Sequence, residues 1–407
     1  MPSFDAYDEA FLDDPYPTYA RLRAETPTFF DETWDLTFFT RHAHVAGILK
    51  DRRFGRDVRS VVPAEELDPQ VARRTYPPHL PEWTKYIRGS FIDLEPPRHT
   101  RIRRLVQWAF TRRASESYRQ RLVTAADGIV EEALGKGRME AIADFATPIP
   151  LAMIAELLGV PPSDQDQLVR WSHAIVRVFD EGHLPEEGLA GEVAVKDFAA
   201  YVRELLADRR AHPGDDLVSA LIRAEHDGDR LDEDELVATC ILTLNAGHEA
   251  TVHGIGNALL ALSRNSGEFR RLQSRPDLVT AAADEVLRFD SPLQMFERWI
   301  LEDLELGGVR LERGHKVGLL FGSANHDEAV FANSETLDVG RVDNPHVSFG
   351  GGIHYCVGAP LAKIELEVAL LSFTQQVGEF TVEGTPDRVR SLVFRGVNEL
   401  PLALSRR

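Results

Sequence analysis

The sequence is poor in cysteine and has no long hydrophobic run. Only Cys240 and Cys356 occur among 407 residues, which excludes an iron–sulfur cluster held by four thiolates. The two thiols could form one disulfide, but free thiols in a reducing cytoplasm are the expected state. No stretch approaches the ~18 apolar residues of a transmembrane helix. The N-terminal residues lack a basic segment followed by an apolar one, so we expect neither a secretory signal nor a membrane anchor.

Basic residues are few relative to acidic ones. Lys and Arg number 46 against 65 Asp and Glu, a formal net charge of −19. This acidic excess favours solubility and argues against a general nucleic-acid-binding protein. The hydrophobic fraction of 43% can fill a large core. We therefore expect a globular protein with neither nucleic acid nor membrane among its partners.

The chain also lacks internal repeats, low-complexity tracts and Ser/Gly-rich linkers, which indicates one domain over residues 1–407. Helical periodicity dominates between residues 100 and 290, as in the segments 117–137 and 193–212. Strand-like stretches are short and lie near the ends of the sequence, at 27–40, 304–320 and 391–404. The pattern predicts a mainly α fold with small β-sheets (α+β).

The segment 62–92 contains five prolines and reads as irregular. A loop of this length in a compact domain is usually functional or mobile. A substrate-access lid and an inert surface loop are both compatible with the segment.

One long helix is predicted to run from about residue 232 to 264. Asp232 and Glu235 have the spacing of a capping box at its start. The helix is apolar on most faces and should be buried, and Cys240 on it is interpreted as a small buried apolar residue. Its middle nevertheless reads Asn-Ala-Gly-His-Glu at 245–249, where glycine costs about 1 kcal/mol relative to alanine and a buried acid needs a partner. This composition indicates a local opening beside a ligand.

The other cysteine lies in Phe-Gly-Gly-Gly-Ile-His-Tyr-Cys-Val-Gly, residues 349–358. A zinc site is disfavoured because His354 and Cys356 have no matching pair of ligands at finger-like spacing. A nucleophilic cysteine would need a general base from elsewhere in the fold. The third alternative is an iron ligand facing a flat cofactor, since glycines let the backbone approach both sulfur and macrocycle. A helix with Pro360 in its first turn is predicted to follow, and its N-terminus would favour the thiolate.

Residues Phe349, Gly352, His354, Cys356 and Gly358 resemble the haem-binding loop of cytochromes P-450, F-x-x-G-x-H-x-C-x-G. A cysteine thiolate is the axial ligand of haem iron in that family. The resemblance implies the cytochrome P-450 fold as a single catalytic domain, with a long central helix over the haem. It also implies haem b as the cofactor and Cys356 as the ligand of its iron.

Further segments match the family over nearly the whole chain. Glu285 and Arg288 fit its E-x-x-R helix, in which they would form a structural ion pair. Residues 95–104 resemble the start of its C helix, and residues 324–341 resemble the meander before the haem loop. Haem propionates are buried anions that need charge-assisted partners. The resemblance implies this set of cofactor-binding residues: His99, Arg103, Arg298, Phe349, Gly350, His354, Cys356 and Gly358.

A thiolate-ligated haem implies a monooxygenase, which inserts one atom of dioxygen into an organic substrate and releases the other as water. The sequence contains no flavin or ferredoxin segment, so electrons would come from a separate ferredoxin-type donor and its NAD(P)H reductase. The arginines 98, 101, 103 and 104 form a basic cluster that could dock an acidic ferredoxin, with a solvated helix face as the alternative. A peroxide-driven or oxidative-coupling enzyme and a non-enzymatic haem sensor or carrier remain open as other function classes.

The predicted pocket is mostly apolar and suits a hydrophobic small molecule, with polyketide, terpenoid, steroid and aromatic compounds all compatible. Ala246 and Gly247 are expected to leave space for dioxygen and substrate. The predicted lining residues are Leu242, Ala246, Gly247, Leu293, Phe296 and Phe394.

Glu249, Ala250 and Thr251 are the predicted catalytic positions, with Glu249 helping to deliver protons. The family motif places a hydroxyl directly after the acid, but this chain has Ala250 there. Thr251 lies about 100° further round the helix and should point away from the groove. Because proton transfer needs a donor within hydrogen-bond reach, we expect a substrate hydroxyl, or a water held by Glu249, to replace the missing group. Chemistry that needs less proton delivery is the alternative.

Overall fold

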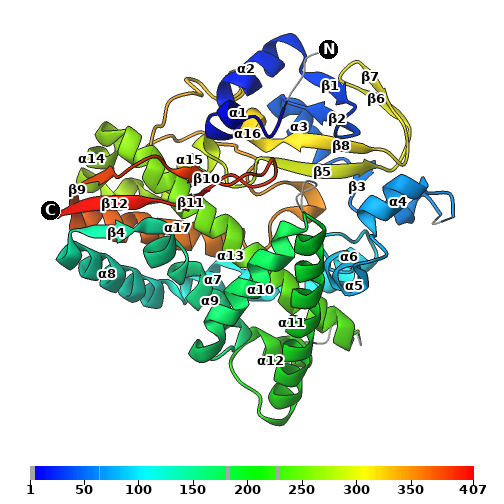
Figure 1. Ribbon diagram of the computed structural model, residues 1–407, viewed down its shortest axis with the longest axis horizontal. Helices are drawn as coiled ribbons and strands as arrows, with labels where there is room; N and C mark the ends of the chain where they lie inside the picture. Colours follow the sequence, from blue (N-terminus) through cyan, green and yellow to red (C-terminus); the bar gives the residue numbers. More distant parts are fainter. Residues whose placement is uncertain (1–4, 64, 180–183, 225–228) are drawn as a thin grey trace. The chain divides into compact units, whose positions relative to one another are not determined.

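The computed structural model describes residues 5–63, 65–179, 184–224 and 229–407, which group into two compact units (Figure 1). Unit 1 comprises residues up to 54 together with 115–150 and 250–407, and unit 2 comprises 55–114 and 151–249. The expectation of one catalytic domain over 1–407 stays a prediction.

A five-stranded sheet organises one half of unit 1, in the order β1-β2-β8-β5-β3. The pairs β1–β2 and β5–β8 are antiparallel, whereas β2 and β8 are parallel. Phe38 and Phe39 of β2 are fully buried on opposite faces of the strand, each in its own apolar cluster. The strands are β1 (Thr28–Asp31), β2 (Leu36–Phe39), β3 (Phe54–Gly55), β5 (Met295–Ile300) and β8 (Lys316–Leu320).

Three smaller sheets belong to the same unit. A three-stranded sheet has the order β4-β12-β9, and two hairpin-like pairs are β6-β7 and β10-β11. The predicted strand regions at 27–40, 304–320 and 391–404 are confirmed. These strands are β4 (Arg138–Glu140), β6 (Leu304–Leu306), β7 (Val309–Leu311), β9 (Val377–Val382), β10 (Asp387–Arg388), β11 (Val397–Glu399) and β12 (Pro401–Arg406).

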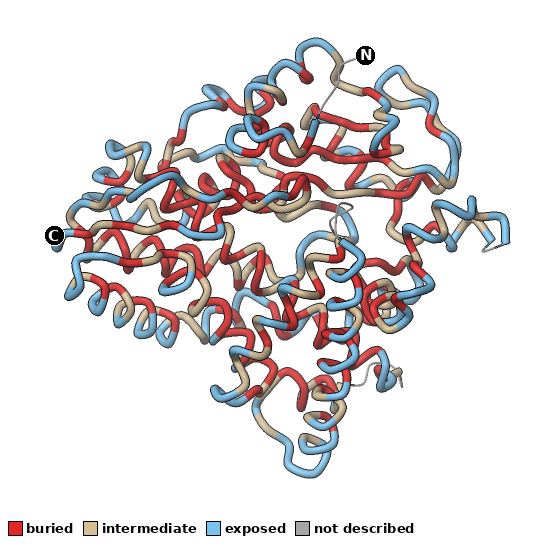
Figure 2. The backbone as a smooth tube through the Cα atoms, in the orientation of Figure 1, coloured by how far each residue is buried: buried red, intermediate tan, exposed pale blue. Residues whose placement is uncertain are grey.

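Helices α8 and α17 pack side by side in unit 1 (Figure 1). The buried face of α8 carries Leu122, Ala126, Val130 and Ala133 at helical spacing, and its opposite face is exposed (Figure 2). The helices lying wholly in this unit are α1 (Glu9–Asp13), α2 (Tyr16–Glu25), α3 (His42–Ile48), α8 (Arg119–Lys136), α14 (Ser266–Ser274), α15 (Val279–Phe289), α16 (Phe321–Ala324) and α17 (Ala359–Gln376), with a π-helical turn at Ile142–Ala146.

Unit 2 is helical in its described residues. Helices α10 and α11 run side by side (Figure 1), and Trp171 of α10 stacks on Phe198 of α11 with ring centroids 5.1 Å apart. The helices of this unit are α4 (Pro69–Thr75), α5 (Pro81–Ile87), α6 (Arg98–Val106), α10 (Gln165–Arg177), α11 (Pro185–Ala211) and α12 (Leu217–Arg223). Short α7 (Arg112–Glu116) and α9 (Pro148–Leu158) cross the boundary between the units.

The segment 62–92 is more ordered than the sequence indicated. It contains α4 and α5, each of which has a proline at its first helical position. Proline is well suited to this position because its missing N–H would have no intrahelical acceptor there. The prediction that the segment 62–92 is irregular was therefore wrong over α4 and α5.

The long helix is confirmed as α13 (Glu233–Arg264). Its capping box is formed: the Glu235 amide donates to Asp232 Oδ1 at 2.8 Å, and the Asp232 amide donates to Glu235 Oε2 at 3.0 Å. Cys240 is buried, as predicted. Within the described ranges, no helix is both long enough and apolar enough to cross a membrane.

Candidate functional site

The glycine-rich segment 349–358 forms a tight backbone loop in unit 1. The Cys356 amide donates to the Phe349 carbonyl at 2.9 Å, and the Gly350 amide donates to the Val347 carbonyl at 2.8 Å. These bonds close the loop on both sides of the three glycines, so backbone hydrogen bonds fix the position of Cys356.

Two of the three glycines have a backbone conformation that residues with a side chain rarely adopt. Gly350 has φ +69° and Gly352 has φ +64°. A Cβ at Gly352 would also lie 2.1 Å from the carbonyl oxygen of Leu49, the residue after α3. A side chain at position 352 would therefore displace the backbone of the loop 349–358 or the backbone at Leu49.

The thiol of Cys356 is exposed, forms no disulfide, and lies directly before α17. Pro360 occupies the first turn of that helix, as predicted, and the helix N-terminus favours negative charge on the nearby sulfur. A Cβ at Gly358 would lie 4.0 Å from the sulfur. An accessible thiol in a glycine frame at a helix N-terminus fits a thiolate-ligated haem.

Arg298, another predicted cofactor-binding residue, lies on β5 and is only 3% exposed. Its guanidinium stacks over the Phe296 ring at 5.1 Å and donates to the Glu297 carbonyl at 2.9 Å. In unit 2, His99 and Arg103 both lie on α6, where His99 is buried and Arg103 half-buried. Their spacing of four residues places the two side chains on one face of that helix.

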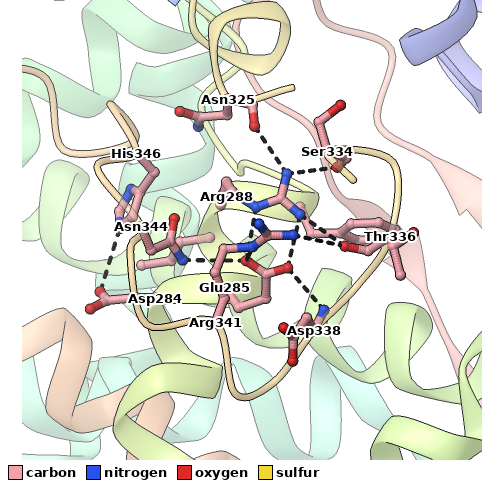
Figure 3. Close-up of polar contacts among 12 residues, drawn as sticks. Asp284, Glu285, Arg288, Asn325, Ser334, Thr336, Asp338, Arg341, Asn344 and His346 are labelled. Carbon is pink, nitrogen blue, oxygen red and sulfur yellow. Dashed lines mark hydrogen bonds and ion pairs between the residues drawn. The ribbon is translucent and has the colours of Figure 1, made fainter. Parts of the chain in front are cut away.

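The predicted Glu285–Arg288 pair on α15 is formed and completely buried, with two parallel bonds of 2.8 Å (Figure 3). The carboxylate of Glu285 also accepts from Arg341 Nε at 2.9 Å and from the Asp338 amide at 3.0 Å. Arg288 in turn donates to the carbonyls of Asn325, Ser334 and Thr336. The pair thus connects α15 to the segment 325–341.

Arg341 is a member of this network to which the sequence analysis gave no role. It lies at the end of the 324–341 segment, and its guanidinium donates to Glu285 and to the Ala332 carbonyl. A carboxylate that is paired with one arginine still has lone pairs for a further charged donor. An arginine in the irregular segment before the haem-loop motif was therefore the available signal.

Glu249 on α13 is held by residues of unit 2. Its Oε1 atom accepts from Ser172 Oγ at 3.3 Å and lies 3.4 Å from His173 Nε2, both on α10. The carboxylate itself is buried, whereas the His173 side chain is 61% exposed. Glu249 is therefore a buried acid beside a titratable group that reaches solvent.

Gly247 allows close packing of two helices. A Cβ there would lie 2.5 Å from Cδ1 of Ile154 on α9, so the glycine lets α9 approach α13. Its role in leaving space for dioxygen and substrate stays a prediction. Leu242, Ala246 and Ala250, spaced by four residues, share another face of α13 and are half-buried or exposed. That face is the accessible stripe of an otherwise buried helix.

Thr251 points to α17. Its hydroxyl hydrogen-bonds to the carboxyl group of Glu365, and both side chains are buried. The expectation that Thr251 does not replace the hydroxyl missing at Ala250 agrees with this contact, since the hydroxyl is committed to another helix.

The remaining predicted pocket residues meet in unit 1. Leu293 and Phe394 form an isolated antiparallel bridge, and both are partly accessible, as is Phe296. The Phe296 ring stacks on Phe321 at 6.2 Å. Leu293 and Phe296 thus pack against the same apolar cluster beside β5, and the pocket lining as a whole stays a prediction.

The basic cluster is only partly available for a partner. Arg101 on α6 pairs with Asp229 at 3.1 Å and with Glu235 in the first turn of α13. Arg98 and Arg104 are exposed. Arg101 therefore joins α6 to α13 through Glu235, and its part in docking stays a prediction.

Comparisons with known proteins give relatives over nearly the whole chain. The family model "Cytochrome P450" matches residues 66–393. The chain is 34% identical over 401 residues to "Biotin biosynthesis cytochrome P450" of Bacillus subtilis, covering 96% of both chains, and 32% identical to "Polyketide biosynthesis cytochrome P450 PksS" of the same organism, covering 99% of both. The crystal structure of P450BioI in complex with hexadec-9Z-enoic acid ligated acyl carrier protein superposes with a TM-score of 0.89 at 32% identity, covering 97% of this chain and 99% of that one.

Proposed function

The chain belongs to the cytochrome P450 family, and from this premise we propose that it hydroxylates or otherwise oxygenates a hydrophobic small molecule, with electrons from a separate ferredoxin and its NAD(P)H reductase. Members of this family are oxidoreductases that bind haem b. When bound, the haem supplies activation of dioxygen, assisted by electron density from the thiolate. The observation that carries the proposal is the loop 349–358, whose backbone presents an accessible thiol at a helix N-terminus.

Cys356 would ligate the iron, and a set of basic side chains would bind the two propionates. A buried arginine such as Arg298 suits a buried carboxylate because charge-assisted bonds offset the loss of water around both groups. His99 and Arg103, on one face of α6, and His354 are assigned to the same role. Phe349, Gly350 and Gly358 shape the loop around the sulfur.

Proton supply is assigned to Glu249. Its Oε1 atom is held by Ser172 and lies next to the exposed His173, so a proton arriving from solvent can reach a buried carboxylate. Ala250 offers no hydroxyl to pass that proton on. A polar group of the substrate, or a water bound to Glu249, therefore completes the hydrogen-bond chain.

The accessible apolar residues of α13 and of the Leu293–Phe394 bridge favour a hydrophobic substrate. Relatives support the chemical class, since one is named for polyketide biosynthesis and a solved neighbour holds a fatty acid on acyl carrier protein. A polyketide or fatty-acyl compound with a hydroxyl near the oxidised carbon would be hydrophobic and would also supply the polar group that Ala250 lacks. A cytoplasmic location is part of the proposal, in keeping with two thiols that form no disulfide.

The test begins with the spectrum of the reduced, carbon-monoxide-bound protein. The wild-type protein and Cys240→Ala should both show the red-shifted Soret band that gives the family its name, whereas Cys356→His should lose it. Retention of the band in Cys356→His would refute the ligand assignment.

Turnover then separates the function classes. Product formed with ferredoxin, reductase and NAD(P)H, and absent with hydrogen peroxide alone, supports the proposal. Product with hydrogen peroxide alone, and none with the redox partners, favours a peroxide-driven enzyme. The missing hydroxyl at Ala250 is the reason for considering this alternative. Some ligands will shift the Soret band. If none of them gives product, either with the ferredoxin system or with hydrogen peroxide, a sensor or carrier is favoured.

A further inference from the structure

Three potential metal ligands converge in unit 2, where α10 faces the middle of α13. The ring nitrogen Nε2 of His173 lies 3.4 Å from Glu249 Oε1, and Nδ1 of His248 lies 3.7 Å from the same oxygen. The three ligand atoms all lie within 4.8 Å of one another. The imidazole rings of the two histidines have centroids 6.0 Å apart.

His248 adds an independent observation. It is 1% exposed, and neither ring nitrogen has a hydrogen-bond partner. A buried polar group left without a partner costs about 1–3 kcal/mol, so this imidazole needs an explanation. Its Nδ1 faces the carboxylate of Glu249 at a separation too long for a hydrogen bond.

We propose that His173, His248 and Glu249 form a binding site for a divalent transition-metal ion of the zinc type. Ligand atoms at 2.0–2.1 Å from a tetrahedral zinc ion lie about 3.4 Å apart. The two nitrogen–oxygen separations already have nearly this value. His173 is mostly exposed, so its ring is free to close the remaining separation between the two nitrogens by rotation about its side-chain bonds.

The donor set determines which ions the site takes. Two imidazoles and one carboxylate suit zinc, nickel, cobalt and copper, whereas magnesium and calcium prefer oxygen ligands alone. Three protein ligands leave the fourth coordination position open to water, and the exposed His173 provides access from solvent. Ser172 Oγ, which donates to Glu249 Oε1, orients the carboxylate as an outer-sphere partner. The ion should therefore exchange reversibly.

Occupation of the site would affect the reaction through Glu249. The ion would coordinate the oxygen that accepts from Ser172 and lies next to His173, which removes that oxygen from proton transfer. This consequence rests on the proposed function, whereas metal binding itself does not. Zinc would act as a reversible inhibitor that leaves substrate binding intact.

Isothermal titration of zinc into the substrate-free ferric holoenzyme, with any affinity tag removed, tests the site. We expect saturable one-to-one binding that is at least about tenfold weaker in His173→Gln and in His248→Gln, and weaker by a smaller factor in Ser172→Ala. His212→Ala is the matched control. His212 lies 3.2 Å from Asp208 on the surface and belongs to no group of three potential metal ligands among the described residues. Zinc binding to His212→Ala should therefore equal that of wild type.

Magnesium should give no heat of binding in the same titration. Absence of saturable zinc binding to the wild-type protein, or equal binding by wild type and His173→Gln, would overturn the proposal. Because His173 is exposed, its variant is expected to fold even where His248→Gln does not.

Turnover separates this inference from the proposed function. With ferredoxin, reductase and NAD(P)H, saturating zinc should lower product formation at least about tenfold in wild type and have no effect on His173→Gln, while ferredoxin reduction by the reductase proceeds as before. One-to-one zinc binding with unchanged turnover would support the metal site and contradict the assignment of Glu249 to proton supply. Normal turnover without zinc binding would overturn only the metal site.

Discussion

The hydroxyl of Thr251 hydrogen-bonds to the buried carboxyl group of Glu365. The bond joins α13 to α17, the helix that follows Cys356. Thr251 carries the only hydroxyl in the helix turn around Ala250, and this hydroxyl is bonded to α17. The effects of mutating Ala250 and Thr251 can therefore be measured separately.

Replacing Ala250 with threonine should restore a hydroxyl on the accessible stripe of α13. With substrate analogues that lack a polar group near the oxidised carbon, we expect Ala250→Thr to raise the product formed per NAD(P)H several-fold. Thr251→Val should leave this ratio unchanged, since its hydroxyl bonds to Glu365. The measurement is product against NAD(P)H consumed and peroxide released. Tight coupling in wild type with a substrate that has no polar group would contradict substrate-assisted proton transfer.

Glu365 should make stability depend on pH. Burial raises the pKa of Glu365 to about 8, and the hydrogen bond from Thr251 opposes this shift. In the unfolded chain a glutamate ionises near pH 4.3. Between these two values the unfolded state releases the proton while the folded state keeps it, so the free energy of unfolding falls as pH rises, by about 1.4 kcal/mol for each unit between the two pKa values.

Denaturant unfolding from pH 5 to pH 8 checks this expectation. Glu365→Gln cannot ionise in either state, so its stability relative to wild type should increase across that range. Thr251→Val keeps the acid and loses the opposing bond, so its pH dependence should extend to higher pH. Parallel curves for Glu365→Gln and wild type would show that the carboxyl titrates normally in the folded protein.

Arg288→Lys should destabilise the protein strongly despite preserving charge. Lysine cannot reproduce two parallel bonds to Glu285 together with donation to three carbonyls, and breaking a buried pair costs about 3–5 kcal/mol. Glu268 and Arg271 on α14 provide the matched control, since they have the same i,i+3 spacing at an accessible site. Arg271→Lys should cost less than about 1 kcal/mol. Similar losses of folded, haem-containing protein in both variants would contradict this distinction.

Arg104→Ala should slow the ferredoxin-dependent rate, most clearly at low ionic strength, because an exposed charge acts on association. Arg101→Ala should instead lower stability by about 1 kcal/mol, since Arg101 pairs with Glu235 at the start of α13. Stopped-flow reduction at two salt concentrations, with thermal unfolding alongside, separates the two effects. If only Arg101→Ala showed a salt-dependent loss of the ferredoxin-dependent rate, Arg101 rather than Arg104 would be the docking residue.

The parts of the fold that were predictable depended on local chemistry. The capping box of Asp232 and Glu235 predicted the start of α13 to within one residue, and Pro360 marked the start of α17. The same chemistry was available in the segment 62–92, where Asp68 accepts from two amides at the start of α4. An acid before a proline is a helix-start signal, so the start of α4 was predictable from Asp68 and Pro69.

Features decided by distant contacts were not predictable from local spacing alone. The spacing E-x-x-R occurs at Glu285–Arg288 and also in the accessible pairs Glu268–Arg271 and Glu116–Arg119, so spacing alone cannot identify the buried one. Gly247 illustrates the same limit, because the methyl group that it accommodates belongs to Ile154, 93 positions earlier in the chain. The periodicity of a helix does not show which of its ion pairs will be buried. It also does not show which distant residue will pack against it.

The contact between Gly352 and the carbonyl of Leu49 has a practical consequence for altering this enzyme by directed evolution. A library that randomises residues 349–358 uniformly would lose most members at position 352, where every side chain meets main-chain atoms, and many at Gly350, where the backbone is left-handed. Ile353 and Tyr355 are exposed on the same loop. Diversity confined to these two positions should therefore yield a high fraction of haem-loaded variants while changing the chemical character of the surface around Cys356.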